Sequence, residues 1–239
     1  MKNLSYLFIA SIFVMVSMSC KKKGCMDSDA SNYNSEAKKD DGTCVYTPNI
    51  TIIAAADTTI SVATEWTDPG ATAANIDGAI VDVTSNSTVD ASEVGVYTVT
   101  YTATNNNGTT TAVRNVNVVI NQDSWMGSWS VSDNCGGGTG LALNGSPEVI
   151  AGGNEEQILI TDFFSGVTGT YGTAICQIDG EDINIAPASD GAPGGLGDIN
   201  YQGFGTMNSN GLSFTITFTY ENTTIVTGSS GTCQATYSK

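Results

Sequence analysis

Alternation of apolar and polar residues is the strongest pattern in this chain, and it is cleanest at residues 212–220. Serine or threonine separates the apolar positions, which are Leu212, Phe214, Ile216, Phe218 and Tyr220. Successive side chains of a strand point to opposite faces, so this stretch predicts an antiparallel strand with one buried and one solvated face. Weaker forms of the pattern predict further strands at residues 125–131, 158–163, 173–178, 182–185 and 200–207.

A second set of strands is predicted between residues 49 and 120. Alternation is clear at residues 96–101, and turn signals such as Pro69-Gly70 and Asn107-Gly108 separate the apolar stretches. About seven short strands at this spacing are typical of a small β-sandwich.

Composition extends the β prediction to the whole chain. Glycine, threonine, serine, asparagine and valine dominate, and helical periodicity is almost absent, so the predicted fold class is all-β. The formal charge is −16, with 8 basic and 24 acidic residues, and from Asp40 to Tyr237 the only basic residue is Arg114. A nucleic-acid-binding protein neutralises phosphates with clustered lysine and arginine, so that class is excluded.

The sequence also limits the chemistry that the chain can perform. It contains no histidine, which removes the usual general base of serine and cysteine hydrolases and the commonest zinc ligand. Glycosidase chemistry needs only two carboxylates and stays open. Its candidates are acidic residues near predicted strand ends, namely Glu155, Glu156, Glu181 and Asp182. No pair among them stands out, and we expect neither enzymatic activity nor a cofactor.

Residues 1–19 have the pattern of a signal peptide. A short basic start precedes an apolar run of about fifteen residues, which is shorter than the roughly 20 residues of a membrane span. Small serines flank Met18 directly before Cys20. This stretch resembles the lipobox of bacterial lipoproteins, although that family more often has leucine where Met18 stands. The resemblance implies cleavage before Cys20, whose sulfur then carries an acyl chain such as palmitate.

A lipid on Cys20 would tether the mature chain to a membrane. The next residue is Lys21, and the absence of aspartate there resembles lipoproteins that are sorted to the outer membrane of Gram-negative bacteria. We therefore expect a lipid-anchored protein of the outer membrane or cell surface, in either orientation. The alternative is an ordinary secretory signal that leaves Cys20 in the mature chain as a thiol.

The remaining cysteines predict disulfides. With one of the 6 cysteines used as an anchor, an oxidising compartment favours two disulfides and one spare thiol. Cys25 and Cys44 bracket one short segment and are expected to pair. Among the other three, Cys135 with Cys233 is preferred because they lie near the ends of the last segment, but the other two pairings stay open. Cys176 alternates with apolar residues and is expected to face the core.

Residues 24–46 form a short acidic segment between cysteines. It resembles a module of bacterial surface proteins with the pattern GCTD, NYN and DDGSC, matched here at residues 24–25, 32–34 and 40–44. A segment this short has no core of its own, so the disulfide is its expected staple. Its carboxylates also fit a calcium site, with candidate ligands Asp27, Asp29, Asp40 and Asp41. The alternative is that these side chains close turns through hydrogen bonds to the backbone.

The sandwich segment resembles an immunoglobulin-like family of bacterial surface proteins. The resemblance lies at residues 66–71, 77–78, 95–103, 107–108 and 114–116. It implies a stalk, a spacer or an adhesion module, and no catalysis. Tyr97 and Tyr101 are expected in the core or at a corner of the sandwich rather than on a ligand.

Residues 121–239 are predicted to form an antiparallel meander that closes into an up-and-down barrel, because closure removes exposed sheet edges. The sequences GSWSVSDNC and GTCQATYSK at its two ends resemble lipocalin-like domains of bacterial lipoproteins. A barrel of about eight strands either fills with side chains or holds one small ligand, and the bulky residues favour filling. Residues 186–195 are expected to form a loop.

The predicted organisation is therefore a signal peptide at residues 1–19, a lipidated, cysteine-bracketed module at 20–47, an immunoglobulin-like domain at 48–120 and the antiparallel β-domain at 121–239. We expect an envelope lipoprotein that presents a β-rich head on a stalk for adhesion or binding. As an alternative, the head binds a glycan, a protein or a small apolar molecule. Its candidate aromatic contacts are Trp125, Trp129, Tyr201, Phe204 and Tyr220.

Overall fold

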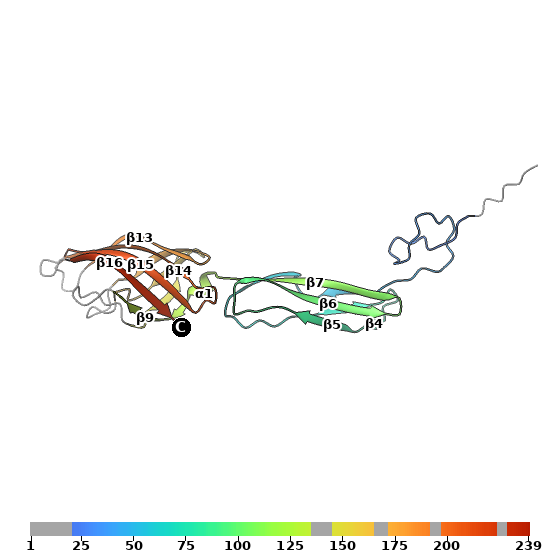
Figure 1. Ribbon diagram of the computed structural model, residues 1–239, viewed down its shortest axis with the longest axis horizontal. Coiled ribbons are helices and arrows are strands. Elements are labelled where there is room, and N and C mark those ends of the chain that lie inside the picture. The colour runs from blue at the N-terminus through green and yellow to red at the C-terminus, as the bar shows by residue number, and fades with distance from the viewer. Residues whose placement is uncertain (1–20, 135–144, 165–171, 192–196, 224–228) are drawn as a thin grey trace, which may run out of the picture.

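A computed structural model describes residues 21–134, 145–164, 172–191, 197–223 and 229–239. In these residues the chain forms sixteen β-strands and one short helix, α1 (Gln122–Trp125), which confirms the all-β prediction. Figure 1 shows three parts one after another along the molecule: the segment closed by cysteines, a sandwich and a barrel-like sheet. The described residues contain no helix that is long and apolar enough to cross a membrane.

The sandwich consists of two sheets. In sheet order, its strands are β1 (Asn49–Ile52), β3 (Ala71–Ala74) and β4 (Ile80–Val81), then β2 (Asp57–Ser61), β7 (Gly108–Val119), β6 (Gly95–Asn105) and β5 (Val83–Ser87). Neighbouring strands are antiparallel except β2 and β7, which run parallel. Tyr101 lies in the core, and the Tyr97 hydroxyl donates to the carbonyl oxygen of Glu93. The predicted strands and the expected places of both tyrosines are therefore confirmed.

In its described residues, the C-terminal β-domain is a single antiparallel sheet of nine strands. In sheet order they are β8 (Gly127–Ser128), β10 (Glu148–Ala151), β11 (Gln157–Ile160), β12 (Ala174–Asp179), β13 (Asp182–Gly191), β14 (Asp198–Met207), β15 (Ser213–Asn222), β16 (Ser229–Ser238) and β9 (Ser130–Asp133).

One short stretch supplies both ends of this sheet. β8 pairs with β10, and β9, which follows it directly, pairs with β16. Trp129 lies between β8 and β9, and its backbone N–H donates to the carbonyl oxygen of Pro147 over 3.0 Å. The sheet is therefore nearly closed, which confirms the predicted barrel. The prediction of one continuous strand at residues 125–131 is wrong, because the chain leaves α1 and turns at Trp129 to reach both edges.

Aromatic side chains fill the described interior of the barrel. Phe214 stacks on Tyr237 with ring centroids 4.3 Å apart, and Trp125 and Trp129 meet the same ring edge-on. All four are at most 1% exposed. This packing matches the predicted filled interior and leaves a small apolar ligand no space among these side chains.

Two local predictions for the barrel are wrong. Leu212 is 47% exposed, because it lies in the turn before β15 rather than in the strand. Residues 186–191 continue β13 instead of forming a loop, with a β-bulge between Ile185 and Ala188 that accommodates Pro187, which has no N–H for the ladder. Residues 192–195 of the predicted loop lie outside the described residues.

The sandwich and the barrel share one apolar cluster. It runs from Val116 and Val118 of β7 through Val62 and Ile120 to Trp125 of α1. Hydrogen bonds add a second connection, since the Val94 N–H donates to the carbonyl oxygen of Ser209 and the Ser209 hydroxyl donates to Glu93. The turn between β14 and β15 therefore rests on the end of the sandwich, and we call this contact the joint.

Gly211 is the tightest point of the joint, and we expect its replacement by alanine to loosen it. A Cβ atom at Gly211 would lie 2.6 Å from the Val62 Cγ1 atom, and the backbone φ of +67° is itself unfavourable for alanine. Overpacking of this kind costs about 1–3 kcal/mol. Gly211→Ala should lower the unfolding temperature of the full chain and increase cleavage by protease near residue 120.

The matched control for this experiment is Gly180→Ala. Gly180 occupies a similar hairpin turn with a φ of +56°, and a Cβ atom there would meet nothing within 4 Å. It should therefore carry the same backbone penalty without loosening the joint. Equal protease sensitivity of the two variants would show that the contact with Val62 does not hold the parts together.

Candidate functional site

The cysteines are placed as follows. Cys25 and Cys44 form the predicted disulfide, with Cα atoms 4.8 Å apart. Cys233 is also disulfide-bonded. Its predicted partner Cys135 and the predicted lipid carrier Cys20 lie outside the described residues, so both assignments stay predictions. Cys176 is a free thiol with no exposed surface, as the alternation predicts, and burial raises its pKa to about 12.

The acidic side chains of the cysteine-bracketed segment close turns. Asp27 accepts hydrogen bonds from the Asp29 N–H and the Tyr46 hydroxyl, and the Tyr46 bond lowers the pKa of Asp27. The Asp40 side chain accepts a hydrogen bond from the Gly42 N–H. The Asp41 side chain accepts hydrogen bonds from the N–H and the hydroxyl of Thr43. No group of three or more acidic, histidine or cysteine side chains in the described ranges is arranged to hold a metal. The turn alternative therefore accounts for Asp27, Asp40 and Asp41, and the calcium assignment stays a prediction.

Asn32 ties the two halves of this segment together, a role that its place in the NYN motif did not reveal. Its side-chain nitrogen donates to the carbonyl oxygen of Thr43 over 2.7 Å, and its side-chain oxygen accepts from the Val45 N–H over 3.0 Å. A side-chain amide can serve as donor and acceptor at once, which aspartate at neutral pH cannot do. The Asn32 side chain thus links two stretches of backbone, as a pairing of strands would, in a segment that has almost no core.

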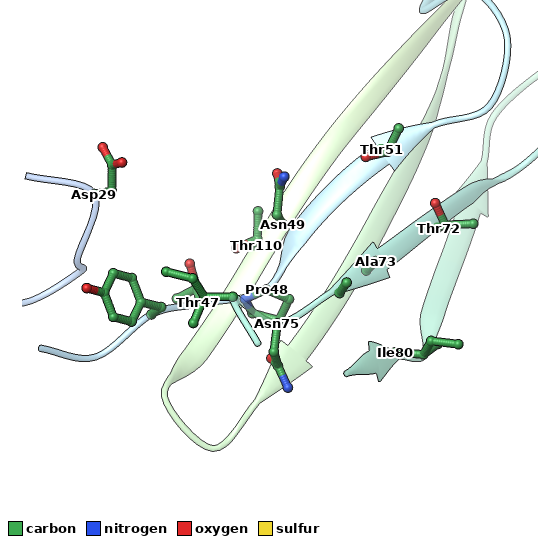
Figure 2. Close-up of a pocket in the computed structure, with 13 residues that line it drawn as sticks. Asp29, Thr47, Pro48, Asn49, Thr51, Thr72, Ala73, Asn75, Ile80 and Thr110 are labelled. Atoms are coloured by element: carbon green, nitrogen blue, oxygen red, sulfur yellow. The ribbon is translucent and has the colours of Figure 1, made fainter. Parts of the chain in front are cut away.

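A groove of about 920 Å³ lies where the segment meets the sandwich. Figure 2 shows Asp29 on one side and Thr72, Ala73 and Ile80 of the three-stranded sheet on the other. The Tyr46 carbonyl oxygen accepts bonds from the side chains of Asn105 and Asn107 at the floor of the junction. Only Asp29 and Tyr46 among the lining residues can ionise, so the groove offers no pair of carboxylates for acid–base chemistry.

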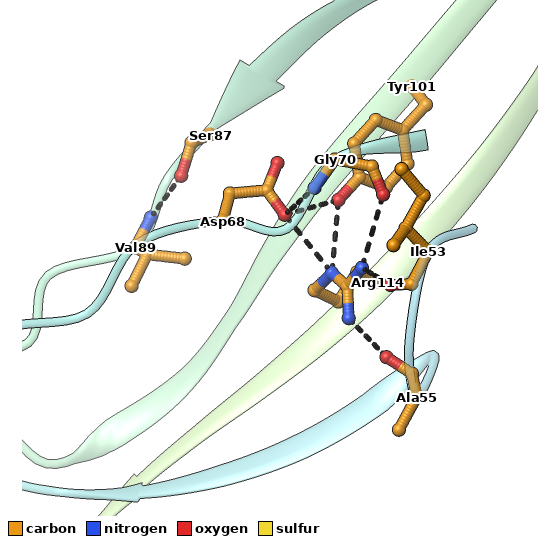
Figure 3. Close-up of polar contacts among 8 residues, drawn as sticks. All are labelled: Ile53, Ala55, Asp68, Gly70, Ser87, Val89, Tyr101 and Arg114. Carbon is orange, nitrogen blue, oxygen red and sulfur yellow. Dashed lines mark hydrogen bonds and ion pairs between the residues drawn. The ribbon is translucent and has the colours of Figure 1, made fainter. Parts of the chain in front are cut away.

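Arg114 is a fully buried cation inside the sandwich. Figure 3 shows its guanidinium between Asp68, the Tyr101 hydroxyl and the backbone. Its Nε atom is 3.2 Å from Asp68 Oδ1 and 3.0 Å from the Tyr101 oxygen. The terminal nitrogens donate to the carbonyl oxygens of Ala55, Ile53 and Gly70. All donors of this side chain point inward, so Arg114 is a structural residue and is not available to a ligand.

The candidate acids of a glycan hydrolase do not form an enclosed pair. Glu155 and Glu156 line a hollow of about 430 Å³ beside the joint, which Asp123 and Asp179 also line. Each of the four predicted acids, Glu155, Glu156, Glu181 and Asp182, is exposed. Glu156 also lines a hollow of about 620 Å³ together with Asp182, so these two candidates share one solvent-exposed surface.

Phe204 is the exposed member of the predicted aromatic set. Trp125, Trp129, Tyr201 and Tyr220 are at most 6% exposed and pack the core, whereas the Phe204 side chain is 66% exposed on the outside of β14. Phe204 belongs to a row of residues that are cross-strand neighbours on β12 to β16. In strand order, these residues are Gln177, Asn184, Phe204, Thr217 and Gln234. We call this row, with Gln202 and Thr219 beside it, the Phe204 face.

Close packing on the inner side of β14 fixes Phe204 on the outside. Its neighbours Gly203 and Gly205 point inward, where a Cβ atom on Gly205 would lie 1.8 Å from the carbonyl oxygen of Thr215. A register shift of one residue would turn Phe204 into this space. The exposed aromatic ring is therefore imposed by the packing of the barrel.

Shallow hollows run past Phe204 in the direction of β14. One of about 620 Å³ and one of about 520 Å³ share Asn184 and Phe204 as a common wall. A third of about 670 Å³ shares Gln202 and Thr219 with the second. Together they form an elongated surface, which we take as the candidate binding site. Amide and hydroxyl groups line its middle, and the outer hollows also contain the carboxylates Glu156, Asp179, Asp182 and Glu221.

Replacement of Arg114 by methionine should destabilise the sandwich by about 3 kcal/mol, because it leaves the Asp68 carboxylate and three carbonyl oxygens without their donor. Denaturant unfolding of the full chain measures the loss. Asn115→Ser is the control, since the Asn115 side chain bonds Asp57 on the exposed face of the same strand. An Arg114→Met variant as stable as Asn115→Ser would contradict the network.

Cys176 should not react with a thiol reagent at pH 8 in the native chain and should react once the chain is unfolded. A pKa of about 12, raised by burial from 9.0, lowers the reactive thiolate fraction roughly a thousandfold. Titration with and without denaturant, with disulfides kept oxidised, measures this. Cys176→Ala should remove the reaction in denaturant. A thiol that persists in that variant would contradict either the acylation of Cys20 or the pairing of Cys135 with Cys233.

Comparison with known proteins gives one family match. No curated protein matches the chain. Among solved structures, it is similar to a lipoprotein of Bacteroides thetaiotaomicron, with 13% identity, a TM-score of 0.28 and coverage of 80% of this chain and 100% of that one. It is also similar to the CBM51-2 and INT domains of Clostridium perfringens ZmpB, with 17% identity, a TM-score of 0.22 and coverage of 76% of this chain and 42% of that one. TM-scores this low support no conclusion. Residues 50–118 match the bacterial surface protein, Ig-like domain family, so this part of the chain is an immunoglobulin-like domain of that type.

Proposed function

We propose that this chain is a lipid-anchored cell-surface protein of a Gram-negative bacterium that acts by binding, with the immunoglobulin-like domain as its stalk and the barrel as its head. The observation that carries the proposal is the order of the parts in space. The cysteine-bracketed segment, which follows Cys20 in the sequence, lies at one end of the molecule, the barrel lies at the other, and the sandwich lies between them (Figure 1). A lipid on Cys20 would then hold the head away from the membrane.

The joint supports the role of a stalk. Val62 and Ile120 are buried between sandwich and barrel, and the Ser209–Glu93 hydrogen bond restrains the second connection. A stalk that is packed against its head transmits orientation, whereas a flexible linker would only set a range of distances. The head is therefore presented in a defined direction relative to the stalk.

Basic residues next to Cys20 support the proposed attachment of this end of the chain to a membrane. Lys21 and Lys23 are exposed, and each lysine beside an anionic headgroup contributes about 1 kcal/mol to membrane binding. Lys22 instead forms an ion pair with Glu36. The lysines therefore supplement the acyl chains, which supply most of the anchoring free energy.

Radiolabelled palmitate should be incorporated into the wild-type chain and not into Cys20→Ala, because the thioether at Cys20 is the only proposed site of acylation. Fractionation should place the wild type in the membrane and release the variant. Cys176→Ala is the control and should be labelled normally. Equal labelling of the wild type and Cys20→Ala would refute the anchor.

A further inference from the structure

We propose that the Phe204 face binds a neutral polysaccharide, laid along the hollows that follow β14. This inference names the ligand class of the proposed head and so rests on the proposed function. It is argued from the ring, the charge distribution and the shape of the surface.

Phe204 supplies the contact that a sugar ring prefers. A pyranose ring has an apolar face of C–H groups and a polar edge of hydroxyls, so it pairs with an aromatic ring surrounded by amide and hydroxyl side chains. Asn184 and Thr217 are paired with Phe204 on either side, and Gln202 lies two residues along the same strand. Side-chain amides both donate and accept, which suits hydroxyls that do the same.

The charge distribution selects a neutral ligand. The chain has a formal charge of −16, yet the residues of the Phe204 face are all uncharged. Acidic residues line the two end hollows, with Glu156, Asp179 and Asp182 in one and Glu221 in the other. This distribution repels anionic polymers, whereas the residues paired with Phe204 offer only amide and hydroxyl groups, which suit a neutral polymer.

The surface also disfavours an extended peptide as the occupant. Peptides bind to sheets mainly by adding a strand at a free edge, where main-chain groups are open. β13, β14 and β15 each have a hydrogen-bonded neighbour on both sides. The face therefore offers side chains alone, and its linked hollows fit a linear polymer that is recognised through repeated ring and hydroxyl contacts.

The test is native affinity electrophoresis of the full chain in non-ionic detergent. Gels contain galactomannan, xyloglucan, laminarin or pullulan as neutral probes and polygalacturonate as the anionic probe. We expect retardation by at least one neutral polymer, unchanged at high salt because no charges are paired, and none by polygalacturonate. Absence of retardation by all four neutral polymers would overturn the proposal.

Variants of Phe204 separate sugar stacking from ordinary apolar docking. Phe204→Ala should weaken binding by about tenfold, the loss expected for one central aromatic contact. Phe204→Tyr should bind like the wild type, whereas Phe204→Leu should be as weak as the alanine variant because it keeps apolar area and loses the ring. Retained binding in Phe204→Leu, or in Phe204→Ala, would overturn the assignment.

Two controls keep the result interpretable. Val96 is 75% exposed on the sandwich, so Val96→Ala removes a comparable exposed apolar side chain away from the face and should not change binding. Thermal unfolding should change little in the Phe204 variants, since the Phe204 side chain is 66% exposed and lies outside the core. Binding in detergent does not depend on Cys20, so failure of the anchor and failure of the glycan site are separate outcomes.

Discussion

The joint between the sandwich and the barrel is the constraint on which the shape of the molecule depends. An apolar cluster continues from Val118 through Val62 to Trp125, so neither part has a complete core without the other at this end. The chain connection at Ile120 alone would leave rotation free. Because the turn at Ser209 contacts the sandwich at a second point, rotation about the connection is restrained. A presenting stalk requires a restraint of this kind.

Alternation predicts the strands well because burial of one sheet face is a local signal. The regular stretch that begins at Phe214 becomes β15 with its apolar side chains inside, and the same period places Cys176 in the core. Turn residues fix the hairpins for an equally local reason, as at Gly180 between β12 and β13. The acidic segment was open to a metal or a turn interpretation, because aspartate serves both and only the hydrogen bonds distinguish them.

What the sequence does not predict depends on contacts between distant residues. Arg114 stands out as the only basic residue of its region, yet only the structure shows it bound to carbonyl groups of two separate loops. Residues 127–133 supply a strand to each edge of the sheet because the barrel closes there. Closure depends on residues that are far apart in the sequence, so no short stretch of sequence predicts it. Phe204 was one of five aromatic candidates. The sequence signal for its exposure was the glycine on each side, since a core strand that places glycine inward turns the intervening residue outward.

The direction of the Phe204 face follows from the joint. The end of β14 near Met207 leads into the turn that rests on the sandwich, and its other end, near Asn200, lies away from the stalk. The hollows therefore run from the stalk side toward the free end of the head, along its side. A site at the tip of the head would favour the end of a polymer, whereas a site along the side accepts the middle of a chain that continues past both ends. Such a geometry lets several heads occupy one long polymer, so weak single contacts add up to firm attachment when many anchored copies share a surface.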